Sequence, residues 1–475
     1  MGNTECNRDK ASKKGLWNLI DDIEGDKVVW IIVLLLILIS ILAIFSSTPL
    51  LPSDSRLNVM KDHGITAFLG LMLIIGLYNI KKIGVFRVLS QFGFLLSFTL
   101  LLILDLHLNL GIIKAQRIND AWRTLGLLGF QIHVFEVVKV AMVMYLAWAT
   151  NSYTIDQKAA AKKEESPTFM LANMLAKHPH TSFMGKPLAK RLLYIYGPAL
   201  LICAMVAPGS NSSAIFIAAI LVVTILIGNM PWKEIALACM VLAAMAASMA
   251  GLHKMTDGKF IPRLETLFSR MEAEYSTEIL DGIKPGSKEF YETVDKIRQP
   301  YGAKLAVHEG GLLGKGSGNS TQKYCVTHIY SDFMFSFLVE EYGLVGGLLI
   351  IILYVSLLAR SSIIARLCGN RFAKTAVGGL AVLITGQAFM HIAVNVDLTP
   401  MTGQTLPLIS DGASAFLMSC TAFGTILSIS RMAKKKIQSV EDKAGCDMDS
   451  IAENIAKAEN SAIRAEQAKT WDTEK

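Results

Sequence analysis

The sequence predicts an all-α polytopic membrane protein with about ten transmembrane helices and a large extracytoplasmic loop between the seventh and the eighth. Hydrophobic residues make up 52% of the 475 positions and charged residues only 18%, a balance too apolar for an ordinary soluble protein. Apolar runs long enough to cross a hydrocarbon layer of about 30 Å recur along the chain. The net charge of +7 lies mostly between these runs, so it indicates membrane orientation rather than binding to nucleic acid.

The first three predicted spans cover residues 28–46, 65–80 and about 88–106. The first apolar run is long and has no small-residue cleavage site after it, so we interpret it as a membrane span and not as a cleavable signal peptide. Lysine and arginine side chains between the second and third spans place that turn on the inner side of the membrane.

The fourth span, within residues 116–150, is less regular, because charged side chains precede its apolar run. Lysines are in excess in the loop 151–191 that follows, as is typical of cytoplasmic loops. The remaining spans are predicted at residues 192–207, 214–227, 234–252, 333–358, 377–396 and 415–429.

Two longer connections interrupt the later spans. Residues 253–331 are the largest polar stretch and are predicted to lie outside the membrane. Residues 397–414 hold two prolines and two glycines in a mostly apolar setting. Such a segment is typical of a partly re-entrant loop, which is tolerated only where protein or water satisfies its backbone.

Three domains follow from this pattern: a cytoplasmic N-terminal segment (1–27), a transmembrane domain (28–432) and a cytoplasmic C-terminal tail (433–475). An even number of spans puts both termini on one side of the membrane. Basic residues between Arg431 and Lys436 identify that side as the cytoplasm. The seven cysteines are scattered singly, without metal-binding or disulfide spacing.

The stretch from Glu309 to Gly347 is the strongest candidate for a functional site. It begins with a run of glycines, which allow the backbone to approach a ligand closely, and among them Lys315, Ser320 and Gln322 supply hydrogen-bond donors. Asp332 then stands at the start of an apolar helix, which places a carboxylate at a membrane boundary. This order suits a phosphate-bearing, partly apolar substrate. The alternative is a flexible connector followed by a helix N-cap.

Charged residues elsewhere are further candidates. Glu136 and Lys139 are three positions apart, so on a helix they share a face and can pair, either at a site or simply to close the helix start. Arg263 and Arg270 can hold a pyrophosphate through forked hydrogen bonds, or form surface ion pairs with neighbouring glutamates.

Four elements in chain order resemble the signature of the bacterial SEDS family (shape, elongation, division and sporulation). They are Ala121, Arg123, Glu136 and Lys139; Arg263, Thr266 and Arg270; the glycine run with Lys315, Ser320, Gln322, Ser331 and Asp332; and Pro400, Gly403, Leu406, Pro407, Ile409 and Ser410. The sequence departs from the family pattern at Asp120, Thr124, His133, Val134, Phe135, His391 and Asp411. Within the family, residues 402–410 and the polar tails are more similar to the cell-division members than to the elongation members.

The resemblance implies a peptidoglycan glycosyltransferase of the bacterial inner membrane that polymerises lipid II during septal cell-wall synthesis and releases undecaprenyl pyrophosphate. It implies a class B penicillin-binding protein and other divisome proteins as partners, within membrane lipid and without nucleic acid. Asp332 would be the general base, since it is the only acidic residue between Gly310 and Val339. Lys315, Ser320, Gln322, Arg263, Arg270, Arg123, Glu136 and Lys139 would bind substrate.

Two other functions fit the same pattern. A lipid-linked precursor flippase also has many spans with broken segments, although we find no inverted repeat. A non-catalytic divisome scaffold would use the outer loop only to bind partners. The sequence predicts no protein metal site, and it leaves open whether a divalent cation takes part.

Overall fold

The computed structural model describes residues 24–48, 53–109, 113–118, 121–127, 130–162, 164, 168–255, 284, 287–326 and 329–434. The chain divides into a helical bundle, residues 26–429, and a second unit formed by the two chain ends. In the described part of that second unit, Lys434 Nζ donates a hydrogen bond to the carbonyl oxygen of Gly25 at 2.8 Å.

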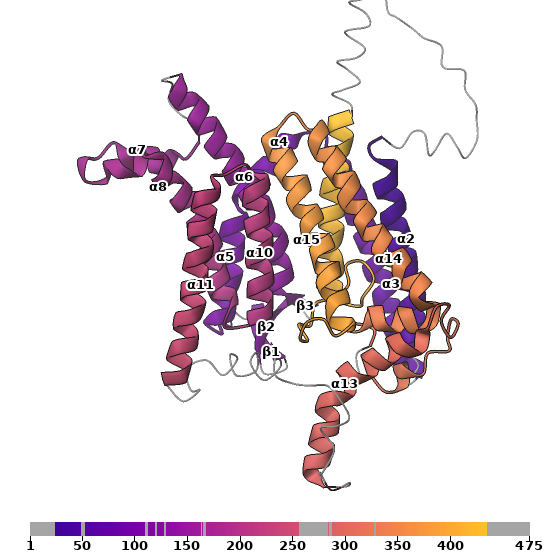
Figure 1. Ribbon diagram of the computed structural model, residues 1–475. Coiled ribbons are helices and arrows are strands. Elements are labelled where there is room, and N and C mark those ends of the chain that lie inside the picture. Colours follow the sequence, from indigo (N-terminus) through magenta and orange to yellow (C-terminus); the bar gives the residue numbers. More distant parts are fainter. Residues whose placement is uncertain are drawn as a thin grey trace, which may run out of the picture. The chain divides into compact units, whose positions relative to one another are not determined.

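Helices build almost all of the bundle (Figure 1). In the first half they are α2 (Lys27–Ser47), α3 (Ser53–Tyr78), α4 (Ile83–Gln91), α5 (Gly93–Asp105), α6 (Val134–Ala161), α7 (Met170–Ala176), the 3-10 helix η1 (Pro179–Gly185), α8 (Pro187–Arg191), the π-helical turn η2 (Leu192–Tyr196) and α9 (Gly197–Val206). In the second half they are α10 (Asn211–Ile227), α11 (Trp232–Met255), α13 (Lys288–Gly310), the 3-10 turn η4 (Gln322–Tyr324), α14 (Met334–Leu367), α15 (Arg371–Asn395) and the helix Ala413–Lys434.

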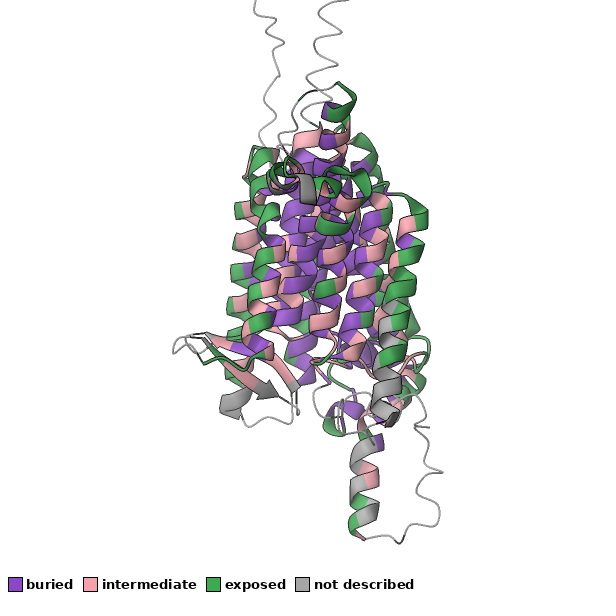
Figure 2. Cartoon of the chain, turned by 90° about the vertical axis from the view of Figure 1, so that its left-hand side faces the viewer, coloured by how far each residue is buried: buried purple, intermediate pink, exposed green. Residues whose placement is uncertain are grey.

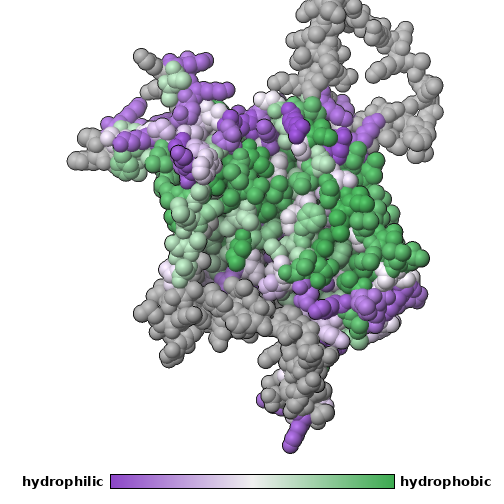
Figure 3. Space-filling view, viewed as in Figure 1, coloured by the Kyte–Doolittle hydropathy of each residue, from purple (hydrophilic) through white to green (hydrophobic). Residues whose placement is uncertain are grey.

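The described helices confirm a polytopic membrane protein. Eight of them, counting α4 with α5 and α8 with α9 as single spans, are long and apolar enough to cross a membrane, and α10 is a shorter apolar helix. Buried residues face the middle of the bundle in Figure 2, whereas the outer faces carry exposed leucines such as Leu34 and Leu38 on α2. The surface is accordingly apolar in a belt between two polar ends (Figure 3). Lipid tails replace water around such a belt.

A small antiparallel sheet is the main departure from the predicted all-α fold. Its strands are β1 (Ile113–Ile118), β2 (Ala121–Leu127) and β3 (Phe130–His133), in the order β1-β2-β3. Thr124 is paired with Gln116 on one side and with His133 on the other. The fourth span begins at Val134, within the predicted segment 116–150, because the three strands take up residues before it.

The segment between α15 and the last helix runs back into the bundle. Leu406, Leu408 and Ile409 are at most 1% exposed. The hydroxyl of Tyr354 donates to the carbonyl oxygen of Pro407 at 2.5 Å, and Ser40 Oγ donates to that of Ile409 at 2.8 Å. Protein side chains thus satisfy this irregular backbone, as the prediction of a partly re-entrant loop requires.

The two ends of the bundle differ. The sheet and α13 lie at one end, and α7 and α8 lie at the other (Figure 1). Asp332 belongs to the first of these ends, because it immediately precedes α14 near the polar loop that follows α13.

Candidate active site around Asp332

The backbone of Asp332 is held from two sides. Its carbonyl oxygen accepts a hydrogen bond from Asn395 Nδ2 on α15 at 3.1 Å, and the preceding carbonyl, of Ser331, accepts one from Ser410 Oγ at 2.7 Å. The N-cap of α14 is Phe333, with no side-chain capping bond, so Asp332 is not the helix cap that was one sequence-based alternative. Its position therefore depends on α15 and the re-entrant loop.

The carboxylate of Asp332 is partly exposed. Ser331 Oγ donates to its Oδ1 at 3.2 Å. Its Oδ2 lies 3.9 Å from the place that a Cβ atom would take at Gly403, a residue with φ of +63° in the re-entrant loop. A side chain at position 403 would stand against the carboxylate, whereas glycine leaves that approach open.

Lys139 is the centre of a buried polar cluster next to this loop. Its amine, 3% exposed, donates to Oε1 of Glu136 at 2.7 Å, of Gln387 at 2.8 Å and of Gln404 at 3.1 Å. The predicted pair of Glu136 and Lys139 is thus present, and it ties α6 to α15 and to the re-entrant loop. Gln387 and Gln404 were not among the predicted site residues, although Gln404 lies next to the family's glycine at 403.

His133 lies within electrostatic reach of four charged side chains that the sequence analysis identified separately. Packing around the ring lowers its pKa below the ordinary 6.5; the charges of Glu136 and Asp332 oppose this shift, and those of Arg123 and Lys139 add to it. The four charged side chains therefore act on one imidazole at the end of β3. The departure from the family motif at position 133 was the available signal for this residue. Its backbone N–H donates to Ser414 Oγ at 3.1 Å, which fastens β3 to the last helix.

Arg123 lies on β2, where its Nε donates to the carbonyl oxygen of Gly209 at 3.3 Å. This bond connects the sheet to the turn before α10. Arg263 and Arg270 lie outside the described residues, so the structure gives no position for either of them.

The glycine-rich loop is folded tightly onto α14. Lys315 Nζ pairs with Glu340 at 2.8 Å and also with Glu309, and Ser320 Oγ donates to Glu340 at 2.5 Å. The backbone N–H of Gln322 also reaches the Glu340 carboxylate. Burial lowers the pKa of Lys315, but its bonds to Glu309 and Glu340 outweigh that effect and raise the pKa overall. Lys315, Ser320 and Gln322 thus form one structured platform.

Gly343 makes the platform possible. It breaks α14 with φ of +70° and ψ of −175°, and a Cβ atom there would lie 2.3 Å from the carbonyl oxygen of Leu312. The residue after Glu340, Glu341, accepts hydrogen bonds from the hydroxyl of Ser46 on α2 at 2.6 Å and from the backbone N–H of Gly318 at 2.9 Å. Glu340 and Glu341 together connect α2, α14 and the loop.

Two departures from the family pattern have partners in the structure. His391, fully buried, accepts the N–H of Phe335 at Nε2, 3.3 Å away, so its Nδ1 must carry the proton that is shared with the Gln404 carbonyl at 2.7 Å. Asp411 faces Nδ1 of His63 at 3.6 Å, and His63 Nε2 lies 2.9 Å from Ser40 Oγ. Both histidines help to hold the re-entrant loop.

Among the described residues, no group of three or more His, Cys, Asp or Glu side chains could hold a metal ion. Fold and site together define a polytopic membrane protein with a carboxylate, cations and amides gathered at one membrane boundary.

The comparisons with known proteins agree with this description. Residues 26–435 match the family of FtsW, RodA and SpoVE, described as cell cycle protein. Peptidoglycan glycosyltransferase MrdB of Escherichia coli (strain K12) is 26% identical over 91% of this chain and 100% of its own length. The probable peptidoglycan glycosyltransferase FtsW of Thioalkalivibrio sulfidiphilus is 29% identical over 71% of this chain and 72% of its own.

Solved structures share the fold. A chain of a peptidoglycan synthase complex has a TM-score of 0.54 at 19% identity, covering 86% of this chain and 98% of its own. A mutant of the rod shape determining protein RodA of Thermus thermophilus has a TM-score of 0.51 at 18% identity, covering 86% and 97%. The chain therefore belongs to the SEDS family.

Proposed function

We propose that this protein is a peptidoglycan glycosyltransferase that polymerises lipid II, with Asp332 as the general base. The names of its relatives support the reaction. The observation that carries the assignment of the base is the partly exposed carboxylate of Asp332, on a backbone fixed by Asn395 and Ser410 at a membrane boundary. A base must be held within hydrogen-bond reach of the proton that it removes.

The reaction needs a proton acceptor on one side and positive charge on the other. Asp332 would take the proton of the acceptor sugar's 4-hydroxyl as that oxygen attacks the anomeric carbon of the donor, and the bond from this carbon to the pyrophosphate would break. Arg123, with Arg263 and Arg270 from the outer loop, would stabilise the departing undecaprenyl pyrophosphate. Gly403 would leave space for the acceptor beside Oδ2.

The other predicted binding residues have distinct parts in this proposal. Glu136 and Lys139 would shape the cavity wall, since Lys139 is buried and fully engaged by three oxygen acceptors. Lys315, Ser320 and Gln322 would shape the loop beneath the substrate, because Glu340 already accepts their hydrogen bonds.

The proposed cellular role is septal synthesis in the inner membrane, with both termini in the cytoplasm and a class B penicillin-binding protein as partner. The segment 402–410 and the FtsW relatives support the septal role, and the likeness to a chain of a peptidoglycan synthase complex supports such a partner. Depletion of the protein should give filamentous cells. Rounded cells that still divide would point to elongation instead.

The decisive experiment is polymerisation of lipid II by the purified full-length protein with its cognate penicillin-binding protein. Asp332→Asn should lower the rate by about 100-fold or more, as loss of a general base does. Asp397→Asn is the matched control, since Asp397 lies at the same boundary but pairs with Lys304 at 2.6 Å. Glycan formation by Asp332→Asn at the normal rate would remove Asp332 as the base. Lipid translocation without polymer would favour a transporter, and neither activity would favour a scaffold.

A further inference from the structure

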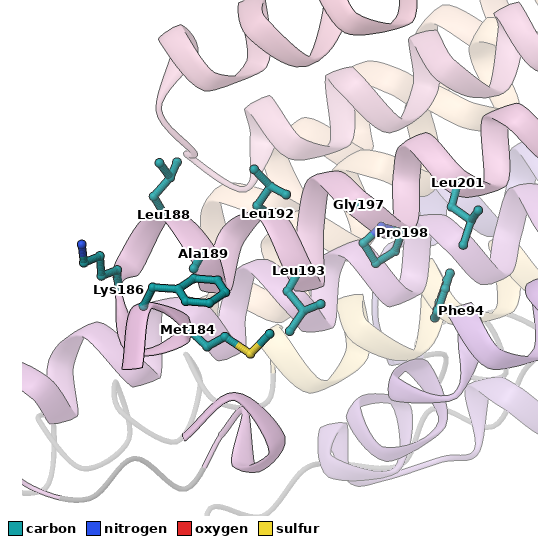
Figure 4. Close-up of a pocket in the computed structure, with 11 residues that line it drawn as sticks. Phe94, Met184, Lys186, Leu188, Ala189, Leu192, Leu193, Gly197, Pro198 and Leu201 are labelled. Carbon is teal, nitrogen blue, oxygen red and sulfur yellow. The ribbon is translucent and has the colours of Figure 1, made fainter. Parts of the chain in front are cut away.

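An apolar groove of about 730 Å³ lies at the end of the bundle opposite Asp332. It is formed by α5, η1, α8, η2 and α9, and Figure 4 shows its side chains in a row from Lys186 to Phe94 and Leu201. Among the described residues that line it, Lys186 alone carries a charge. The volume is in the range of sites that hold small ligands, about 300–1,000 Å³.

The groove depends on an irregular helix. Pro198 has no N–H, so it cannot bond to the carbonyl of Tyr194 four residues earlier, and the hydroxyl of Tyr145 donates to that carbonyl instead at 3.0 Å. The preceding turn, Leu192–Tyr196, is a π-helix, a form that occurs mostly as a local bulge and often at functional sites. Leu192, Leu193 and Pro198 all line the groove.

Among the described basic residues at this end of the bundle, Lys186 differs from its neighbours Lys190 and Arg191 in its charge environment. Lys190 is buried against Asp156 at 2.8 Å, and Arg191 is bound to Glu234, so each neutralises a carboxylate. Lys186 is exposed and, within the described part of the chain, has no ion-pair partner. It directly precedes the membrane span Pro187–Val206, which puts its amine at the membrane boundary and the leucines below it at the depth of the lipid tails.

We propose that this groove binds one anionic phospholipid, with an acyl chain along Leu192, Leu193 and Leu201 and the phosphate at Lys186. Leu192 is 56% exposed and Leu201 43%, so a hydrocarbon occupant is needed at this depth. Anionic headgroups are attracted to basic segments at the membrane surface, and basic pockets between spans bind them selectively. The site is separate from the proposed active site, which lies at the other end of the bundle.

Native mass spectrometry of the full-length protein, released from detergent with equal amounts of phosphatidylglycerol and phosphatidylethanolamine, tests the proposal. The wild type should retain phosphatidylglycerol about fivefold more strongly, which is the preference that one lysine near a membrane surface supplies. Lys186→Glu should abolish this preference, and Ala189→Trp, which fills the groove from a half-buried position on α8, should reduce binding of both lipids. Lys374→Glu is the control, because Lys374 is exposed in the first turn of α15, where a glutamate is favourable.

Three outcomes would overturn the proposal. Equal retention of the two lipids by the wild type would mean that the groove takes bulk lipid without selection. An equal loss in Lys374→Glu would mean that the preference comes from total charge. Binding of a polyprenyl phosphate with no binding of phosphatidylglycerol would assign the groove to a different lipid class. A thermal melt of each variant in detergent shows whether it is folded.

Discussion

The amine of Lys139 donates a hydrogen bond to the side-chain oxygen of Gln404 at 3.1 Å, although the two residues are 265 positions apart in the chain. Gln404 in turn donates to Ser213 Oγ at 3.2 Å, and its carbonyl oxygen contacts His391. One buried cation therefore fixes the re-entrant loop, which carries Gly403 beside the Asp332 carboxylate. Stability and the geometry of the base are coupled at this residue.

Lys139→Met should destabilise the protein strongly. It leaves Glu136 without its cation and removes the donor from Gln387 and Gln404, and breaking a buried ion pair costs about 3–5 kcal/mol. The melting temperature in detergent should fall, and polymerisation should fall with it. Lys158→Met on the same helix is the control, because that side chain is exposed. Equal melting temperatures for the two variants would show that the cluster does not support the fold.

Gly343→Ala should disrupt the platform under the glycine-rich loop. The φ and ψ angles of Gly343 belong to a region open almost only to glycine, which costs other residues about 1–3 kcal/mol, and the added Cβ would also meet the Leu312 carbonyl. The loop should then become more sensitive to proteolysis, and activity should fall. Gly76→Ala is the matched control in a helix, since its Cβ would meet nothing within 4 Å and alanine favours helix. A Gly343→Ala protein as resistant as the control would contradict the strained geometry.

The ion pair of Lys315 and Glu309 should make the loop sensitive to acid. The hydrogen bond from Lys315 lowers the pKa of Glu309 below 4.5, so the carboxylate stabilises the loop above that pH and the stabilisation is lost as the pH falls through the lowered pKa. Lys315 has a raised pKa, so its contribution is complete below pH 10.5. Hydrogen exchange of the loop should therefore differ between wild type and Glu309→Gln at neutral pH and converge only as the pH falls through the lowered pKa of Glu309, below 4.5. A difference that persists unchanged at low pH would argue against this pair.

Much of the fold could be predicted, because the spans are long apolar runs whose length is fixed by the membrane. The strands before Val134 could not, since residues 113–133 lack a regular alternation of polar and apolar side chains. The kink at Gly343 was equally hidden. The sequence alone does not show why a helix contains a glycine. Here the reason is the close approach of the Leu312 carbonyl oxygen, which leaves no space for a Cβ atom at position 343.

The candidate site was predicted in pieces. Asp332 and the pair of Glu136 and Lys139 followed from residue type, spacing and family motif, all of which are local in sequence. Gln404 and His133 were missed because their importance depends on contacts across the fold. The roles expected for Arg263 and Arg270 remain predictions, since both lie outside the described residues.

His133 should determine the acid limb of the pH dependence of polymerisation. Its pKa lies below 6.5, mainly because of burial, so at neutral pH the ring is uncharged and the positive charge nearby comes from Arg123 and Lys139. As the pH falls through this pKa, the ring gains a proton. The new cation would repel these two residues and attract the carboxylates of Glu136 and Asp332, and Asp332 would then be a weaker base.

His133→Gln, which replaces the ring with an uncharged amide, should therefore keep its activity to lower pH than the wild type, while the two rates agree near pH 8. The measurement is the initial rate of lipid II polymerisation between pH 5 and 8 with the partner present. His178→Gln is the control, because His178 is exposed before η1 at the opposite end of the bundle. If His133→Gln and wild type lose activity over the same pH range, the acid limb belongs to another group, and Asp332 itself becomes the first candidate.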